Sequence, residues 1–334
     1  MKILIIRFSS LGDIVLTTPI LSFLKKEYSS SVIHYVTKES FREILEENSN
    51  LDKVFLLKKQ SLFQLAKETK NYDSLPYDLV FDLHNSLRSK LFSMLIKAKK
   101  NYNYKKPYLK RWMLVYMKIN LFKKINEIPY LYIQNYKRGN NQKIKLNRPQ
   151  IIPVALDKKK KLGWNDKKKT IAISAGARWF TKRWPVKNFI NVISKIISEN
   201  PRLQIVLLGG KEEIETSKLI VKSIKNKNLF DFTGKLSIRE SAYLLSKSDL
   251  FLTNDSGLMH VASAFDIKIV ALFLSTVVEF GFQPFTKNKI ILSEKIKCKP
   301  CDHKGLPKCP KKHFQCAYLI TVEKVFNILK ETIK

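Results

Sequence analysis

Short apolar runs alternate with longer segments of helical spacing along both halves of the chain. In the first half the segments follow one another as strand 3–7, helix 14–28, strand 32–36, helix 39–47, and strands 54–57 and 79–83. Such an alternation is typical of a parallel sheet with helices on both faces. The first half therefore predicts a doubly wound, Rossmann-like α/β domain.

A second alternation begins at Thr170, after a highly charged stretch over 102–169 in which the pattern weakens. It comprises strands 170–174, 204–208, 250–253 and 269–273, a short strand near Leu229, and helices 186–199, 212–224, 238–246 and 258–265. A length of 334 residues accommodates two domains with separate cores. We expect domains over 1–165 and 166–320, and a last helix over 321–334 with one apolar face.

The chain is strongly basic, with 62 Lys and Arg against 28 Asp and Glu and a formal charge of +34. This excess attracts polyanions such as nucleic acid, anionic lipid or a phosphorylated glycolipid, and a genome biased toward lysine would explain it as well. The spacing of an RNA-recognition motif or zinc finger is missing, so no specific nucleic-acid partner is expected. Neither a secretory signal nor an apolar run of roughly 20 residues is found. We expect a cytoplasmic protein that is soluble or peripheral to a membrane, and not integral.

The loop after the first strand, Ser9-Ser10-Leu11-Gly12-Asp13, is the first place to look for chemistry. Ligands of doubly wound domains bind at the carboxyl ends of the strands, where two such domains would face a central cleft. Gly12 permits a tight turn. Asp13 would either cap the following helix or accept a proton from a sugar hydroxyl. From the residues alone the two roles weigh equally.

Small residues at Ser174–Arg178 also follow a strand and lead to the cations of Thr181–Pro185. This combination suits a phosphate bound by backbone N–H groups and a lysine, and it would equally suit a solvated basic turn. The spacing differs from that of a Walker loop.

The segment Thr253–His260, TNDSGLMH, lies between an apolar strand and a helix. Asp255 and His260 would contact sugar or phosphate oxygens there, or serve as a helix cap and a structural histidine. Glu212 follows another strand. It would accept hydrogen bonds from ribose hydroxyls, or simply favour the start of its helix.

No GxGxxG follows the first strand, which argues against a nicotinamide or flavin enzyme. No acidic pair suited to a divalent metal stands out, so neither a cofactor nor a catalytic metal is expected. Four cysteines gather near the end of the chain: Cys298, Cys301, Cys309 and Cys316. Their spacing leaves a structural zinc open, with free thiols in a packed loop as the favoured alternative.

Together these segments resemble glycosyltransferase family 9, the ADP-heptose:lipopolysaccharide heptosyltransferases, and most of all its heptosyltransferase II members. The matching stretches are IIRFSSLGDIVLTTP, DLVFDLHNSLRS, SAGARWFTKRWP, LLGGKEE, FTGKLSIRE, LTNDSGLMHVASA and CKPCDHKGLPKCPKKHFQC. They cover nearly the whole chain in the family's order.

The resemblance implies a GT-B fold with an N-terminal acceptor domain, a C-terminal donor domain, and a last helix that packs back toward the first domain. It implies inverting, metal-independent transfer of heptose from ADP-L-glycero-D-manno-heptose to the inner core of lipopolysaccharide, on a lipid A-linked Kdo or heptose acceptor. Asp13 would be the general base, and Lys182 would neutralise the leaving diphosphate, aided by Arg178 and Arg183. The expected donor-binding residues are Gly176, Ala177, Thr181, Glu212, Asp255, Ser256, Gly257 and His260. The expected acceptor-binding residues are Ser10, Gly12, Asn85 and Arg88.

Two other functions stay open at this point. A GT-B enzyme could use another nucleotide-sugar or acceptor, or could be an epimerase. A non-enzymatic basic protein could instead bind membrane or RNA through its charge. The mixed aromatic and basic run Tyr102–Trp112 is a candidate for contact with a membrane or the acceptor, or is the start of an ordinary amphipathic helix.

Overall fold

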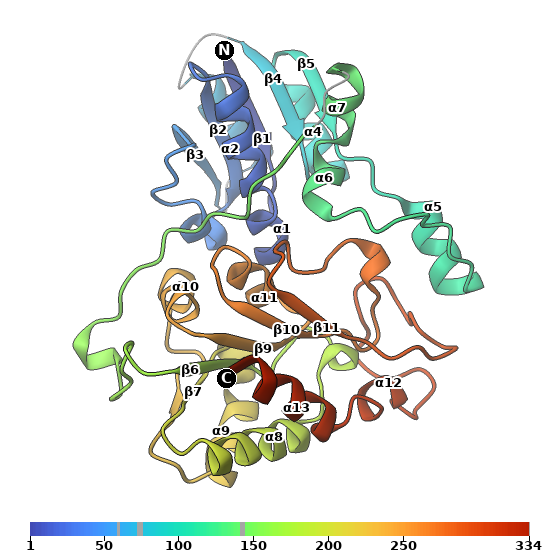
Figure 1. Ribbon diagram of the computed structural model, residues 1–334. Helices are drawn as coiled ribbons and strands as arrows, with labels where there is room; N and C mark the ends of the chain where they lie inside the picture. The colour runs from blue at the N-terminus through green and yellow to red at the C-terminus, as the bar shows by residue number, and fades with distance from the viewer. Residues whose placement is uncertain (59–60, 72–75, 141–143, 334) are drawn as a thin grey trace. The chain divides into compact units, whose positions relative to one another are not determined.

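A computed structural model describes residues 1–58, 61–71, 76–140 and 144–333 (Figure 1). The chain forms two compact units, one of Met1–Pro107 with Asn126–Ile152 and the other of Tyr108–Ile125 with Pro153–Lys334. The boundary that the sequence places at 165/166 thus falls at 152/153, and 108–125 belongs with the second unit. Apolar packing is the reason, because Leu114 and Val115 are buried in a cluster with Phe280.

The first unit contains a parallel sheet in the order β3-β2-β1-β4-β5. Its strands are β1 (Lys2–Ile6), β2 (Val32–Lys38), β3 (Lys53–Leu57), β4 (Tyr77–Asp82) and β5 (Ala98–Asn103). The first four are those that apolar runs predict. The edge strand β5 escaped prediction because its sequence, AKKNYN, is polar and largely exposed.

The helices of this unit are α1 (Leu11–Val15), α2 (Thr18–Glu27), the 3-10 helix η1 (Glu39–Ile44), α3 (Leu62–Asn71), α4 (Leu87–Leu95), α6 (Ile128–Tyr132) and α7 (Gln134–Asn140). The single helix expected over 14–28 is two helices. Pro19 lies in the first turn of α2, where its missing N–H does no harm, whereas a continuous helix would need that N–H.

The second unit contains a parallel sheet in the order β11-β10-β9-β6-β7-β8. Its strands are β6 (Thr170–Ser174), β7 (Gln204–Leu207), β8 (Leu229–Asp231), β9 (Leu250–Asn254), β10 (Lys268–Leu272) and β11 (Lys289–Leu292). Of these only β11, a half-buried edge strand, was not expected. Both halves are therefore doubly wound α/β units, as predicted.

The long helices expected in this unit are present as α8 (Val186–Glu199), α9 (Ile214–Ser223), α10 (Ile238–Ser246), α11 (Gly257–Ala262) and α13 (Val322–Ile333). Shorter segments are α5 (Tyr108–Trp112), α12 (Gln315–Tyr318), the π-helix η2 (Met113–Met117), and the 3-10 helices η3 (Lys158–Lys160), η4 (Phe180–Lys182), η5 (Lys211–Glu213) and η6 (Val278–Phe280). Within the described ranges no helix is both long and apolar enough to cross a bilayer.

Helix α13 completes the core of the second unit. Val325, Phe326, Leu329 and Ile333 are buried there, and the helix packs on α8 and β9. The indole N–H of Trp184, at the start of α8, donates to the carbonyls of Ala317 (3.2 Å) and Ile320 (2.9 Å) just before α13. The apolar face expected over 321–334 is thus confirmed and is used within this unit. Packing of the helix toward the first domain stays a prediction.

Each sheet has one point at which the chain order reverses. In the first sheet β1 lies between β2 and β4, and in the second β6 lies between β7 and β9. The loops that leave two such neighbouring strands diverge to opposite faces, which opens a crevice at their carboxyl ends where ligands bind. The candidate residues should therefore gather after β1 and β4 in one unit, and after β6 and β9 in the other.

Burial of α13 gives a test of the second core. Leu329→Ala removes a fully buried side chain and should lower the free energy of unfolding of this unit by about 2–5 kcal/mol. Leu219→Ala, at a leucine that is 52% exposed on α9, should change it by less than about 0.5 kcal/mol. Urea denaturation followed by tryptophan fluorescence measures both values. Equal losses in the two variants would contradict the packing of α13.

Candidate active site

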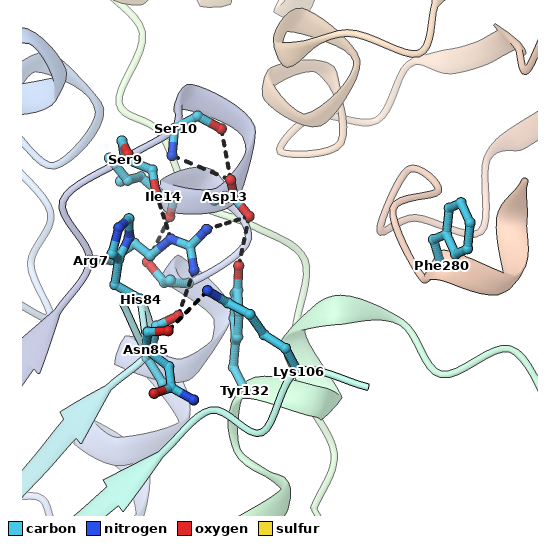
Figure 2. Close-up of polar contacts among 12 residues, drawn as sticks. Arg7, Ser9, Ser10, Asp13, Ile14, His84, Asn85, Lys106, Tyr132 and Phe280 are labelled. Atoms are coloured by element: carbon cyan, nitrogen blue, oxygen red, sulfur yellow. Dashed lines mark hydrogen bonds and ion pairs between the residues drawn. The ribbon is translucent and has the colours of Figure 1, made fainter. Parts of the chain in front are cut away.

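Asp13 lies in α1, directly after β1, and three side chains converge on its carboxylate (Figure 2). A guanidinium nitrogen of Arg7 is 2.6 Å from Oδ1, and the Tyr132 hydroxyl donates to the same oxygen at 2.9 Å. The Ser10 hydroxyl donates to Oδ2 at 2.7 Å. The carboxylate is therefore held in one orientation from three sides.

Arg7 ties this carboxylate to the reversal point of the first sheet. Its Nε donates to the carbonyl of Ser9 at 2.7 Å, and its Nη1 donates to the carbonyl of Leu83, just after β4, at 2.5 Å. The guanidinium carbon also lies 5.4 Å from the centre of the Tyr132 ring. The loops after β1 and β4 are thus joined through one buried cation.

The surroundings of Asp13 control its charge. Burial raises the pKa of this carboxyl, but the charge of Arg7 and the hydrogen bonds from Ser10 and Tyr132 outweigh burial and bring the pKa down to about 2. His84, beside this cluster (Figure 2), has its pKa lowered to about 4 by burial and by the positive charges of Arg7 and Lys106. At neutral pH Asp13 is therefore an anion and His84 is neutral.

Asp82 shapes the loop after β4. Its Oδ1 accepts the backbone N–H of His84 (3.0 Å) and of Asn85 (2.8 Å), and its Oδ2 accepts the Ser89 hydroxyl (2.9 Å). Asn85, at a φ of 45°, donates its amide to the Tyr104 carbonyl at 2.5 Å. Asn85 therefore has a structural role in the loop.

The other acceptor-binding candidates lie close by in the sequence. Gly12 is buried within α1, Ser10 is at the start of α1, and Arg88 is exposed on α4. Their contact with an acceptor stays a prediction.

In the second unit Lys182 forms a buried ion pair with Asp255. Lys182 Nζ is 2.6 Å from Asp255 Oδ2, with the two side chains 15% and 7% exposed. The hydroxyl of Thr276, after β10, donates to the same carboxylate oxygen at 2.7 Å. Lys182 follows β6 by way of η4 and Asp255 follows β9, so the pair lies where the chain order of this sheet reverses.

Asn254, which the sequence did not single out, joins the same two loops. Its amide donates to the carbonyls of Ala175 (2.8 Å) and Gly176 (3.2 Å). Its side-chain oxygen accepts the backbone N–H of Trp184 at 3.0 Å. Its place at the end of β9, directly before Asp255, is the only sequence signal that would have found it.

Thr181, predicted to bind the donor, supports Lys182 in this structure. Its hydroxyl accepts the N–H of Leu306 (2.8 Å) and the hydroxyl of Ser275 (3.0 Å), and donates to the Leu306 carbonyl (3.2 Å). Gly305, at a φ of +103°, lies so close that a Cβ there would be 2.8 Å from Cβ of Trp179 and 3.0 Å from Cγ and Cδ of Lys182. The loop between the cysteines thus fixes the lysine.

Two neighbouring glutamates differ in position. Glu212, the predicted ribose ligand, is exposed. Glu213 accepts the N–H of Gly210 at 2.6 Å and lies so close to Gly176 that a Cβ there would meet its side chain at 1.9 Å. Burial and the neighbouring charge of Glu212 raise the pKa of Glu213. Sequence reasoning missed Glu213, because both residues fit the start of a helix equally well.

The rest of the segment 253–260 forms the end of β9 and the start of α11. Ser256 is the N-cap position of α11, Gly257 opens the helix, and the hydroxyls of Thr253 and Ser256 are 3.2 Å apart. His260 is buried, with its ring 6.5 Å from that of Phe282. Ala177 is also buried. The structure pairs Lys182 with Asp255 and joins Gly176 to Asn254, and the donor contacts of all these residues stay predictions.

The four cysteines are free thiols near one another. Cys298 Sγ is 3.7 Å from Nε2 of His313. Burial, together with the neighbouring thiols, raises the pKa of Cys301 to about 11 and that of Cys316 to about 12. In the part of the chain that the structure describes, no group of three or more His, Cys, Asp or Glu side chains is arranged to hold a metal ion. Because of these raised pKa values, the thiols of Cys301 and Cys316 are protonated at neutral pH.

The model of glycosyltransferase family 9 (heptosyltransferase) matches residues 63–312. Over its whole length the chain is 26% identical to lipooligosaccharide heptosyltransferase 2 of Campylobacter jejuni subsp. jejuni serotype O:2, covering 99% of that protein.

Two solved structures share the fold over almost the full length of both chains. One is the family 9 glycosyl transferase of Veillonella parvula, with a TM-score of 0.80, 22% identity, and coverage of 99% of this chain and 97% of that one. The other is the E. coli ADP-heptose lps heptosyltransferase II, with a TM-score of 0.76, 19% identity, and coverage of 100% and 98%. The predicted GT-B fold is confirmed.

The family match spans most of the chain, both units are parallel α/β sheets, and both carry charged residues at their reversal points. The alternative of a non-enzymatic adaptor is therefore set aside. The chain belongs to glycosyltransferase family 9, the heptosyltransferases, and is an enzyme.

Proposed function

We propose that the protein transfers heptose from ADP-L-glycero-D-manno-heptose to the inner core of lipopolysaccharide by a single displacement that inverts the anomeric centre. Family membership supports sugar transfer, and the names of its relatives point to heptose, an ADP-linked donor and lipopolysaccharide or lipooligosaccharide. The observation that carries the proposal is the oriented, ionised carboxylate of Asp13 at the reversal point of the first sheet.

In this mechanism Asp13 receives the proton of the acceptor hydroxyl. The hydroxyl oxygen bonds to C1 of heptose while the bond from C1 to the diphosphate breaks, and ADP leaves with that electron pair. A carboxylate with a pKa of about 2 is a weak base. It serves because an oxocarbenium-like sugar makes the attacking hydroxyl acidic only as the new bond forms. Arg7 and Tyr132 supply orientation, so little reorganisation is needed during the step.

On the donor side Lys182 neutralises the charge that develops on the departing ADP. Its ammonium group already lies beside Asp255, and the N-terminal N–H groups of α11 and the loop after β6 supply further donors for phosphate oxygens. Arg183 is held at the same loop by its bond to the Ala177 carbonyl at 2.6 Å. We propose that these groups carry the charge without a divalent ion.

The proposed acceptor is linked to lipid A, so the enzyme would work at the cytoplasmic face of the inner membrane as a peripheral protein. Its acceptor residue would be Kdo or a first heptose. The basic surface, with a formal charge of +34, would favour a phosphorylated glycolipid.

The proposal is tested by incubating the purified protein with ADP-heptose and a panel of core acceptors, and following the mass of each acceptor with EDTA present. Gain of one heptose, with NMR of the product showing an inverted anomer, is expected. Turnover of a different nucleotide-sugar would contradict heptosyl transfer and indicate another donor. Turnover of the donor without any acceptor would indicate an epimerase.

Asp13→Asn keeps the shape of the side chain and removes its basicity. We expect kcat to fall by about 10²–10⁴-fold. Asp52→Asn is the matched control, because Asp52 also pairs with a cation, Lys25, at 2.9 Å but on the surface of the same unit. The control should retain normal turnover. A variant at position 13 with more than a tenth of wild-type kcat would exclude Asp13 as the base.

The depressed pKa of Asp13 also predicts how stability depends on pH. Because the pKa in the folded state, about 2, lies below the usual 3.8, ionised Asp13 stabilises the fold above pH 4 and this stabilisation fades as the pH falls toward 2. Between pH 5 and 2.5 the wild type should lose about 1.5 kcal/mol more unfolding free energy than Asp13→Asn. Denaturant titrations across this range measure the difference. Parallel curves would show that Asp13 has an ordinary pKa.

Gly305→Ala tests whether the loop between the cysteines positions Lys182. The added Cβ would press on the lysine stem, and kcat should fall by about tenfold or more, since displacement by about 1 Å can cost 10²-fold. Gly163→Ala is the control: it has a similar φ of +85°, but its Cβ would meet only Phe230 at 3.7 Å. Both variants should lose stability because of the positive φ, Gly305→Ala more because of its closer contacts, and among the folded proteins only Gly305→Ala should lose kcat. Equal kcat in both would remove the positioning role.

A further inference from the structure

Residues 105–125, which we call the basic-aromatic segment, have a composition unlike that of the rest of the surface. The sequence, KKPYLKRWMLVYMKINLFKKI, contains seven basic residues and no acidic one. It also contains one Trp and two Tyr. The tyrosines upstream differ, since Tyr104 is buried and Tyr102 stacks on Phe81 with ring centres 5.2 Å apart. In the run predicted to touch a membrane or the acceptor, the exposed aromatic side chains are therefore Tyr108 and Trp112.

One face of the segment is fixed to the second unit. Leu114 and Val115 are buried against Phe280, and the guanidinium of Arg111 lies 5.5 Å from the centre of the Phe282 ring. Lys118 Nζ donates to three carbonyls, those of Val115 (2.7 Å), Cys298 (3.1 Å) and Pro300 (2.6 Å). In Figure 1, α5 lies beside the loops of this unit. The segment is thus a packed part of the second unit.

Large apolar side chains elsewhere in the segment are exposed to solvent. They are Tyr108, Leu109, Trp112, Tyr116, Met117, Ile119, Leu121 and Ile125. Leu109, Trp112 and Tyr116 stand at positions i, i+3 and i+7, and are 68%, 50% and 67% exposed. This spacing places them on one side of a helical stretch. So large an exposed apolar face on a water-soluble surface marks an interaction site.

The charges of the segment indicate which partner binds to it. A second copy docking by two-fold symmetry would bring this same surface against itself, and exposed cations such as Lys110 and Lys123 would then face like charges. A nucleic acid would satisfy the lysines but would leave aliphatic side chains such as Leu109 and Met117 against phosphates. A bilayer with anionic headgroups satisfies both, because Trp and Tyr favour the interfacial layer and Lys is attracted by its surface potential.

We propose that the basic-aromatic segment docks the enzyme on anionic phospholipid bilayers. Leu109, Trp112 and Tyr116 enter the interfacial layer, while Lys110, Lys123 and Lys124 lie among the headgroups. This docking goes beyond the proposed sugar transfer, since it needs neither donor nor acceptor. It also concerns the second unit, whereas the acceptor candidates lie in the first.

The test is co-sedimentation of the full chain with phosphatidylcholine vesicles, with or without phosphatidylglycerol, in the absence of nucleotide-sugar and acceptor. Wild type should bind only the anionic vesicles. Two variants remove the two features of the segment: Leu109→Ser/Trp112→Ser/Tyr116→Ser and Lys110→Gln/Lys123→Gln/Lys124→Gln. Each should weaken partitioning by at least about tenfold, since each surface cation contributes roughly fivefold.

Matched controls make the same changes elsewhere on the second unit. Leu219→Ser/Tyr318→Ser/Leu319→Ser replaces three other exposed apolar side chains, and Lys222→Gln/Lys225→Gln/Lys227→Gln removes three other exposed charges. Both controls should bind vesicles as wild type does. Losses equal to those of the segment variants would overturn the proposal in favour of the overall charge. A wild-type dimer that the first variant converts to monomer would assign the face to a second copy.

Activity toward a water-soluble acceptor separates this inference from the proposed function. The segment variants should keep wild-type kcat on that acceptor. Vesicle binding without any heptosyl transfer would leave docking intact and remove the proposed reaction. Heptosyl transfer by a wild-type protein that does not bind anionic vesicles would support the proposed reaction and contradict docking.

Discussion

The buried ion pair between Arg7 and Asp13 is the interaction on which the proposed chemistry of the first unit depends. Arg7 would be costly to bury alone, and Asp13 would be drawn toward its neutral form by burial. Paired with each other, and with Tyr132 and Ser10 donating to the carboxylate, they keep a negative charge at the end of β1. The same guanidinium binds the carbonyls of the loops after β1 and β4, so that charge is oriented by the sheet itself.

In the second unit the oriented charge is positive and is carried by Lys182. Lys182 is held by Asp255, whose carboxylate is in turn held by Thr276. Asn254 joins the backbone of the loop after β6 to the end of β9. The loop that carries the cysteines closes over the lysine stem at Gly305. A cation oriented in this way suits the stabilisation of a leaving diphosphate, as the carboxylate in the other unit suits acceptance of a proton.

Much of this could be predicted from the sequence, because strands buried on both faces are continuous apolar runs and their following loops carry Gly, Asp and Lys. Asp13 and Lys182 were found in that way. The edge strand β5 was missed because it is polar, and β11 was missed although its short sequence, KIIL, is mainly apolar. Pro19 divided a helix that looked continuous. Arg7 and Tyr132 were missed because they matter through their contacts with Asp13. These contacts join residues 6 and 119 positions apart in the sequence, and no local pattern predicts them. Thr181 was predicted as a ligand from its place in the loop, and its contacts with Leu306 and Ser275 could not be predicted from that place.

The central claim is that Arg7 and Tyr132 keep Asp13 ionised and oriented for the attacking hydroxyl. The most direct measurement is a carbon-detected NMR titration of the Asp13 side-chain carboxyl, assigned by comparison with Asp13→Asn. The carboxyl should remain ionised down to at least pH 4, in keeping with a pKa of about 2. Titration of this group near or above the usual Asp value of about 3.9 would contradict the claim.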